Sequence, residues 1–172
     1  TKNDKRNYRD YILNMKYIII LLIIFVLLLI PCINYHKSSD GIYYTSRNDE
    51  TANVMNTLRS ISFSLSDKLP EKDSKLLKAS LVFTTFKELN GDSPRVLAWN
   101  YDKGREIAIR IYDSRGNVYP ARQIIRALLH EMAHTLTKTN GHGLKFQQKN
   151  AMLQKYKELY VNTLLNNTFI NK

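Results

Sequence analysis

The 172-residue sequence predicts a small α+β domain, in which a short antiparallel sheet packs on one active-site helix, behind an N-terminal transmembrane helix. Three observations lead to this prediction. Residues 17–35 carry no charge, residues 95–112 contain two alternating apolar segments joined by a turn, and residues 121–137 repeat apolar side chains at helical spacing around a His-Glu-x-x-His motif. The length allows one domain of modest size besides the apolar run.

The N-terminal region is basic and then apolar. Residues 1–16 contain five cations against two acidic residues, whereas Ile18 to Ile30 includes no polar residue. At a rise of about 1.5 Å per residue, residues 17–35 approach the thickness of a hydrocarbon core of roughly 30 Å. We therefore expect a basic tail over 1–16 and a transmembrane signal anchor over 17–35 that lies in the lipid bilayer. A cleaved signal peptide is the main alternative.

Flanking charge predicts the orientation of this anchor. The cations before the span outnumber Lys37 and Arg47 after it, so the positive-inside rule places the N-terminus in the cytoplasm. The prediction is a single-pass membrane protein whose C-terminal domain lies on the non-cytoplasmic side. The abundance of Asn, Lys, Ile and Tyr is typical of an A/T-rich viral or microbial genome.

The segments after the apolar run differ in how clearly they indicate structure. Residues 36–50 have the polar and glycine-containing composition of a linker. Residues 51–69 carry apolar side chains at helical spacing and end at Pro70, which predicts an amphipathic helix. Residues 76–89 are ambiguous, because a strand-like centre lies within an otherwise helical context.

The segments closest to the motif are easier to assign. Residues 95–99 and 106–112 alternate as strands, and residues 100–104 between them predict a hairpin with a glycine-containing turn. Residues 114–117 predict a second turn. Pro120 then stands at a typical position for the start of the motif helix.

The motif itself predicts a metal site. His130 and His134 are four residues apart, so on a helix both imidazoles reach one ion from the same face. A catalytic Zn²⁺ site takes a third protein ligand and keeps a fourth position open for water. His142 is the candidate for that ligand, since the glycine-containing segment after the helix would let it fold back. Glu131 lies about 100° further round the helix, where it can act as general base. A chance pair of surface histidines is the alternative.

Composition limits the remaining functions. The net charge of +11 favours anionic partners such as lipid headgroups or nucleic acid, without choosing between them. Cys32 is the single cysteine, which excludes an internal disulfide and a cysteine-based zinc finger. Residues 146–165 predict one last helix, whose lysines are typical of a solvated face. No motif for a serine or cysteine nucleophile and no phosphate-binding loop is present.

The order of these parts resembles that of the WLM family of zinc metallopeptidases and its SprT (Spartan)-like relatives. The shared features are a strand at 107–112, a proline before the helix, the motif at 130–134 and the tail Gly141-His142-Gly143 followed by Phe146. Residues 100–104 also resemble the Asn-x-x-x-Gly turn of WLM domains, whereas the tail is closer to the SprT form. The resemblance covers residues 81–165.

This resemblance implies a zincin-like metallopeptidase domain over residues 51–172, with Zn²⁺ on His130, His134 and His142 and with Glu131 as general base. The implied reaction is hydrolysis of peptide bonds in a protein or peptide substrate, by a chain that we expect to be a monomer. The best-known relatives cut proteins crosslinked to DNA, which adds nucleic acid as a candidate partner. Two other classes stay open: a non-catalytic zinc-binding structural module, and a basic nucleic-acid-associated protein.

Two further expectations concern the substrate. If the strand at 106–112 is the sheet edge beside the cleft, it would pair with an extended substrate backbone. Tyr119 and Tyr156 are weak candidates for stabilising an oxyanion, and packing of their rings is the simpler interpretation.

Overall fold

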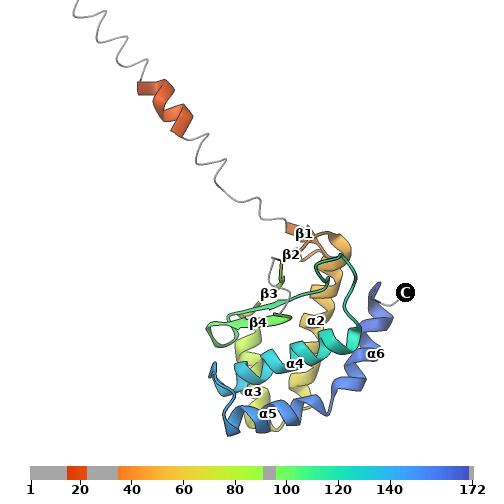
Figure 1. Cartoon of the computed structure of the whole chain (residues 1–172). Coiled ribbons are helices and arrows are strands. Elements are labelled where there is room, and N and C mark those ends of the chain that lie inside the picture. The colour runs from red at the N-terminus through yellow and green to blue at the C-terminus, as the bar shows by residue number, and fades with distance from the viewer. Residues whose placement is uncertain (1–14, 23–34, 91–95, 171–172) are drawn as a thin grey trace, which may run out of the picture. The chain divides into compact units, whose positions relative to one another are not determined.

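A mixed five-stranded sheet with helices packed against it forms the framework around the motif (Figure 1). The computed structural model describes residues 15–22, 35–90 and 96–170. Two units make up the chain, Thr1–Ile33 and Asn34–Lys172, and the sheet belongs to the second. The α+β class predicted from the sequence is confirmed.

The strand order is β1-β2-β3-β5-β4. The sequence predicts an antiparallel sheet, and this prediction is wrong because the sheet is mixed. The central strand β3 (Thr85–Glu88) pairs in parallel with β2 (Tyr43–Thr45) and with β5 (Glu106–Ile109). The edges β1 (Tyr35–Lys37) and β4 (Ala98–Tyr101) each add an antiparallel pair. The sheet is mixed because helices connect β2 to β3, as a parallel pairing requires.

The segment 36–50 is not the linker that the sequence predicts. It contains most of β1, all of β2 and the turn between them, in which Gly41 has a φ of 89°. Strands of three residues are too short to show alternation, so their composition resembled that of a linker. The sheet therefore includes two strands that precede the domain predicted to begin at residue 51.

Two helices connect β2 to β3. The first, α2 (Asp49–Asp67), confirms the predicted amphipathic helix, and its N-cap residue Asn48 accepts a hydrogen bond from the backbone N–H of Thr51 at 2.8 Å. The second, α3 (Glu71–Leu81), begins directly after Pro70. The ambiguous residues 76–89 therefore divide into the end of α3 and the strand β3.

The motif lies on α4 (Ala121–Thr137), whose bounds match the prediction. The helix packs against α3, α5, α6 and the hairpin of β4 and β5. The single last helix predicted over 146–165 is instead two helices, α5 (Leu144–Gln154) and α6 (Lys157–Asn167). The core consists of apolar side chains from α2, the sheet and α4, among them Met55, Leu58, Ile61, Leu65, Ile107, Ile109, Ile124, Ile125 and Leu128.

Within the described residues, no helix has both the length and the apolar character needed to cross a membrane. This finding contradicts the predicted single-pass membrane localisation and its orientation. Residues 1–14 of the predicted tail and 23–34 of the predicted anchor lie outside the described residues.

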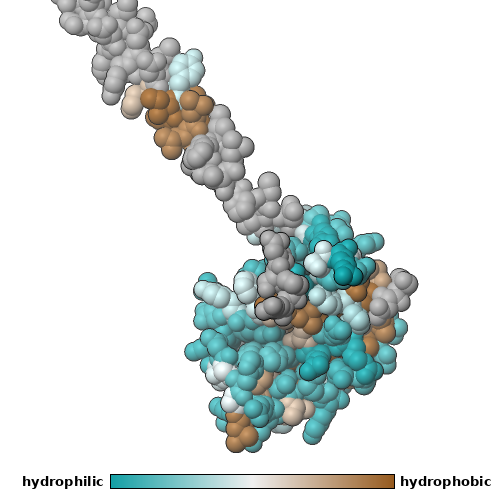
Figure 2. All heavy atoms as spheres, in the orientation of Figure 1, coloured by the Kyte–Doolittle hydropathy of each residue, from teal (hydrophilic) through white to brown (hydrophobic). Residues whose placement is uncertain are grey.

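The unit Asn34–Lys172 presents a largely hydrophilic face in the view of Figure 2. Some apolar side chains of this unit are nevertheless exposed, among them the neighbours Val82 and Phe83, and Leu144. Polar surface of this kind suits a protein whose binding site is a local cavity.

Candidate metal centre

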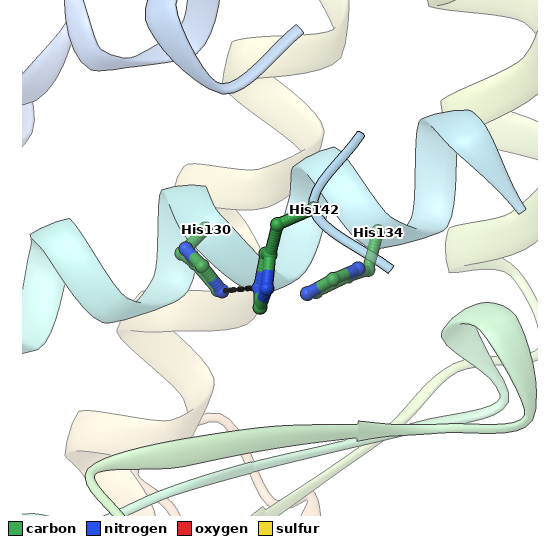
Figure 3. Close-up of side chains that lie close together, drawn as sticks. All are labelled: His130, His134 and His142. Atoms are coloured by element: carbon green, nitrogen blue, oxygen red, sulfur yellow. Dashed lines mark hydrogen bonds between the residues drawn. The ribbon is translucent and has the colours of Figure 1, made fainter. Parts of the chain in front are cut away.

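Three histidine side chains converge at the C-terminal half of α4 (Figure 3). His130 and His134 come from the helix, and His142 comes from the loop between α4 and α5. The ring centroids of each pair lie 5.0 Å apart, and one ligand nitrogen of each ring lies within 4.8 Å of the other two. The structure therefore brings together the three histidines that the sequence predicts as metal ligands.

The loop that carries His142 begins with a reversal of the chain at Lys138. This residue has a φ of 53°, in the left-handed region, and its backbone N–H donates to the carbonyl of His134. Its ammonium group donates to Ser80 Oγ at 2.9 Å and to the carbonyl of Lys103 at 3.0 Å. The helix therefore ends at Lys138, whose side chain is hydrogen-bonded to Ser80 and Lys103. The glycine-containing turn that was expected to end the helix follows this residue.

A backbone hydrogen bond fixes the tautomer of His134. Its Nδ1 lies 2.8 Å from the carbonyl oxygen of Thr139. A carbonyl oxygen only accepts hydrogen bonds, so Nδ1 carries the proton and Nε2 keeps a lone pair. Metal-binding histidines commonly show such an outer partner, which orients the ring and makes it a better ligand.

The ring of Phe146 supports all three histidines. Its centroid lies 4.9 Å from that of His130, 4.3 Å from that of His134 and 4.7 Å from that of His142. The side chain is buried within the first turn of α5. The sequence shows Phe146 four residues after His142, but that spacing alone does not reveal a contact with all three rings.

The electrostatics of the site favour neutral imidazoles. Burial, the neighbouring His134 and His142, and the cation of Arg126 together lower the pKa of His130 to about 4. Burial is also the main cause that lowers the pKa of His134. Neutral rings with free nitrogen lone pairs are the form that binds Zn²⁺.

The spacing of the nitrogens also fits zinc. Nε2 of His142 lies 3.1 Å from Nε2 of His130. In a tetrahedral site with Zn–N bonds of about 2.0–2.1 Å, two ligand nitrogens stand roughly 3.3 Å apart. The spacing of His130 and His142 is therefore close to that of two ligands on one zinc ion, and a ligand nitrogen of His134 lies within 4.8 Å of both.

Glu131 lies next to the histidines in a buried position. The residue is 5 % exposed, and burial raises the pKa of Glu131 to about 7. The side chain lines two adjoining cavities, one of about 720 Å³ and one of about 240 Å³, and His130 lines both. A carboxyl that titrates near neutral pH beside an accessible cavity suits proton transfer.

The hairpin turn is fastened to the same helix by Asn100. Its Nδ2 donates to the carbonyl of Glu131 and to Thr135 Oγ1, both at 2.8 Å, and its Oδ1 accepts from the N–H of Gly104 at 2.6 Å. Gly104 has a φ of 108°, and a Cβ there would lie 2.6 Å from Cγ2 of Thr135. The Asn-x-x-x-Gly sequence therefore lets the turn after β4 approach α4 closely. The sequence predicts a turn at these residues but not this contact with the helix.

The expectation for the substrate-binding strand requires correction, whereas the two tyrosines agree with packing as the simpler interpretation. The strand β5 lies between β3 and β4, so β4 and not the predicted 106–112 strand is the edge on this side. The hydroxyl of Tyr156 donates to the carbonyl of Lys68, away from the histidines. Tyr119 packs against the core and lines neither of the two cavities beside the metal centre.

Converging histidines beside a buried glutamate, on an α+β fold, define the class of zinc-dependent hydrolases. The chain belongs to the WLM family, because the model of the WLM domain matches residues 76–170. It is accordingly a zinc metalloprotease, a hydrolase that acts on peptides, and the family expectation from the sequence is confirmed.

Comparison with solved structures adds two similar chains. The crystal structure of Wss1 from Saccharomyces cerevisiae matches with a TM-score of 0.42 and 26% identity, covering 55% of this chain and 75% of that one. The crystal structure of a Wss1 mutant matches with a TM-score of 0.42 and 25% identity, covering 59% and 81%. Among curated proteins no relative matches.

Proposed function

We propose that the chain is a zinc-dependent endopeptidase in which His130, His134 and His142 bind the metal and Glu131 is the general base. The observation that carries this proposal is the convergence of three imidazoles next to a buried carboxyl that opens into two cavities. Zinc bound there would polarise the scissile carbonyl and lower the pKa of the attacking water.

The residues of the chain would move the proton. Glu131 takes a proton from the attacking water and passes it to the leaving amine, and a pKa of about 7 suits both steps. The hydrogen bonds of Asn100 to the Glu131 carbonyl and to the Thr135 hydroxyl hold the turn of α4 that presents this carboxyl. The hydrogen bond of His134 to Thr139 keeps the ring oriented toward the metal.

The edge strand β4 would bind the substrate backbone. Ala98, Trp99 and Asn100 line the smaller cavity together with the three histidines and Glu131. β4 lies at the end of the strand order, and no strand within the described residues pairs with its outer edge, where an extended peptide could add as a further strand. Main-chain pairing of this kind binds many sequences with little selectivity.

The basic charge favours one class of protein substrate. With a net charge of +11, the chain would be attracted to proteins held on an anionic polymer such as nucleic acid. This agrees with the substrate that the family resemblance implies, proteins crosslinked to DNA. Salt-dependent cleavage of a DNA-bound protein, compared with the same protein free, would test this second part of the proposal.

Substitution of Glu131 by Gln tests the catalytic role. We expect E131Q to bind about one zinc per chain like the wild type and to lose cleavage of a protein substrate by roughly 10²- to 10⁴-fold, the contribution of a general base. The measurements are elemental analysis and kcat/KM on the same preparations.

A matched control is E71Q, because Glu71 is exposed and pairs with Lys75 on the surface of α3. It should keep both zinc and cleavage. If E131Q cleaves as fast as E71Q, Glu131 is not the general base and that part of the proposal fails. If zinc-loaded wild type and E71Q cleave no protein substrate, the zinc would have a structural role and the endopeptidase proposal would fail.

A further inference from the structure

The larger cavity beside the metal centre has a polar end that the proposed reaction does not use. From His130 and Glu131 the cavity of about 720 Å³ extends along α4 toward its N-terminus. Residues of α5 and the first residue of α6 line its other side. A substrate side chain next to the scissile bond would enter this space.

The helix places a cation one turn before the metal. Arg126 precedes His130 by four residues, so the two side chains share one face of α4, about 6 Å apart along the axis. Gln123 lies on the same face a further turn away and also lines the cavity. Arg126 is therefore within reach of a side chain one or two residues from the reacting carbonyl.

Arg126 differs from the neighbouring arginine in its ion pairing within the described residues. Arg122 pairs with Glu158 at 2.7 Å, whereas the guanidinium of Arg126 forms no ion pair with any residue that the structure describes. Lys157 adds a second cation to the cavity and lies 3.6 Å from Glu158. Glu131 is the single acidic side chain among the described lining residues, and it lies at the metal end.

Amide groups complete the polar end. Gln154 Nε2 donates to the carbonyl of Arg126 and to Oδ1 of Asn150, both at 3.2 Å. Since Oδ1 of Asn150 accepts this bond, its Nδ2 remains a donor in the same cavity that Arg126 lines. A guanidinium with a nearby N–H donor is the set that binds a carboxylate.

We infer that this end of the cavity is a subsite for an acidic side chain, so that the protease prefers substrates with Asp or Glu close to the scissile bond. The inference rests on the proposed function and names a substrate class for it. A peptide side chain fits better than a nucleic-acid strand, because the cavity is lined by three helices and the residues before β4 and contains two cations. A strand would need a longer row of cations to follow its phosphates.

Matched peptides test the subsite. Pairs that differ only by Glu or Gln at each position near the cleaved bond are compared by kcat/KM with the zinc-loaded full chain. We expect the Glu peptide to be preferred by about tenfold at one position, as for one charge-assisted hydrogen bond. R126Q should reduce this ratio to about one, and R126E should favour a Lys peptide.

The control is R122Q, since Arg122 lies one turn away and does not line the cavity. It should keep the wild-type preference. Equal rates for Glu and Gln peptides at every position, or a preference that survives in R126Q, would overturn the inference while leaving the protease activity established.

Two other outcomes separate the alternatives. If the wild type cleaves no peptide, the proposed function fails, and the subsite is then judged by the affinity of fluorescent Glu and Gln peptides for wild type and R126Q. A single-stranded oligonucleotide that displaces the Glu peptide, and that itself binds more weakly to R126Q, would assign the cavity to nucleic acid and overturn the inference.

Discussion

The metal centre joins two regions that are held in place in different ways. His130, Glu131 and His134 lie on α4, whose inner face is fully buried against the sheet and the other helices. His142 lies in the exposed loop of residues 138–143. The packing of the fold therefore positions the helical part of the site, whereas the position of the loop part depends on a few hydrogen bonds and on the metal.

The two regions also differ in the kind of contact that holds them. Asn100 bonds the backbone of α4 to the hairpin, and apolar packing fixes the rest of the helix. The loop is held by the side chain of Lys138, by the Thr139 carbonyl on His134, and by Gln147 Nε2, which donates to the carbonyl of His142 at 3.1 Å. Local opening should therefore begin in the loop.

Substitution of a histidine should give the largest loss of zinc affinity, and it compares the helical region with the loop directly. We expect H134A to weaken zinc binding more than H142A, because His134 supplies a ligand and also holds Thr139 in place. Both losses should exceed the roughly 10- to 100-fold cost of removing an outer partner of a metal ligand. Competition with a chromophoric chelator measures the two affinities. Wild-type affinity in H142A would show that the loop supplies no ligand.

Phe146 should give the next largest effect, because its ring contacts the histidines of both regions. We expect F146A to lose about 3–5 kcal/mol of unfolding free energy, measured by urea denaturation of the metal-free protein. Its zinc affinity should fall as well, since the rings lose their common support.

The control for this variant is F146L, which keeps much of the apolar volume and should lose less of the unfolding free energy. If F146A retained wild-type stability and zinc affinity, the phenylalanine would not link the two regions, and each would be held on its own.

The helical region is also the part that the sequence predicts best. Residues 121–137 repeat apolar side chains over many turns, and the histidine spacing is readable only because that periodicity fixes the face. The hairpin and its turn were predicted for a similar reason, since two alternating runs flank a short glycine-containing connection.

What the sequence did not predict depends on contacts between distant segments. The parallel pairing of β3 with β2 and β5 leaves no local pattern, and it determines that β4 is the edge beside the site. The apolar run at 17–35 was also wrong as evidence for a membrane span. Hydropathy describes only the composition of a segment, and no helix within the described residues is long and apolar enough to cross a membrane.

The smallest expected effect is that of Gln147, which tests the loop without removing a ligand. Q147A removes one hydrogen bond to the carbonyl of His142, worth about 0.5–1.5 kcal/mol, so zinc affinity should fall by roughly two- to tenfold. Amide exchange in residues 138–143 should become faster, with that in α4 unchanged. Q148A is the control, because Gln148 is exposed on the same turn of α5 and should leave both measurements at the wild-type level. Faster exchange in α4 as well would show that the two regions open together, since a bond made only by the loop would then stabilise the helix.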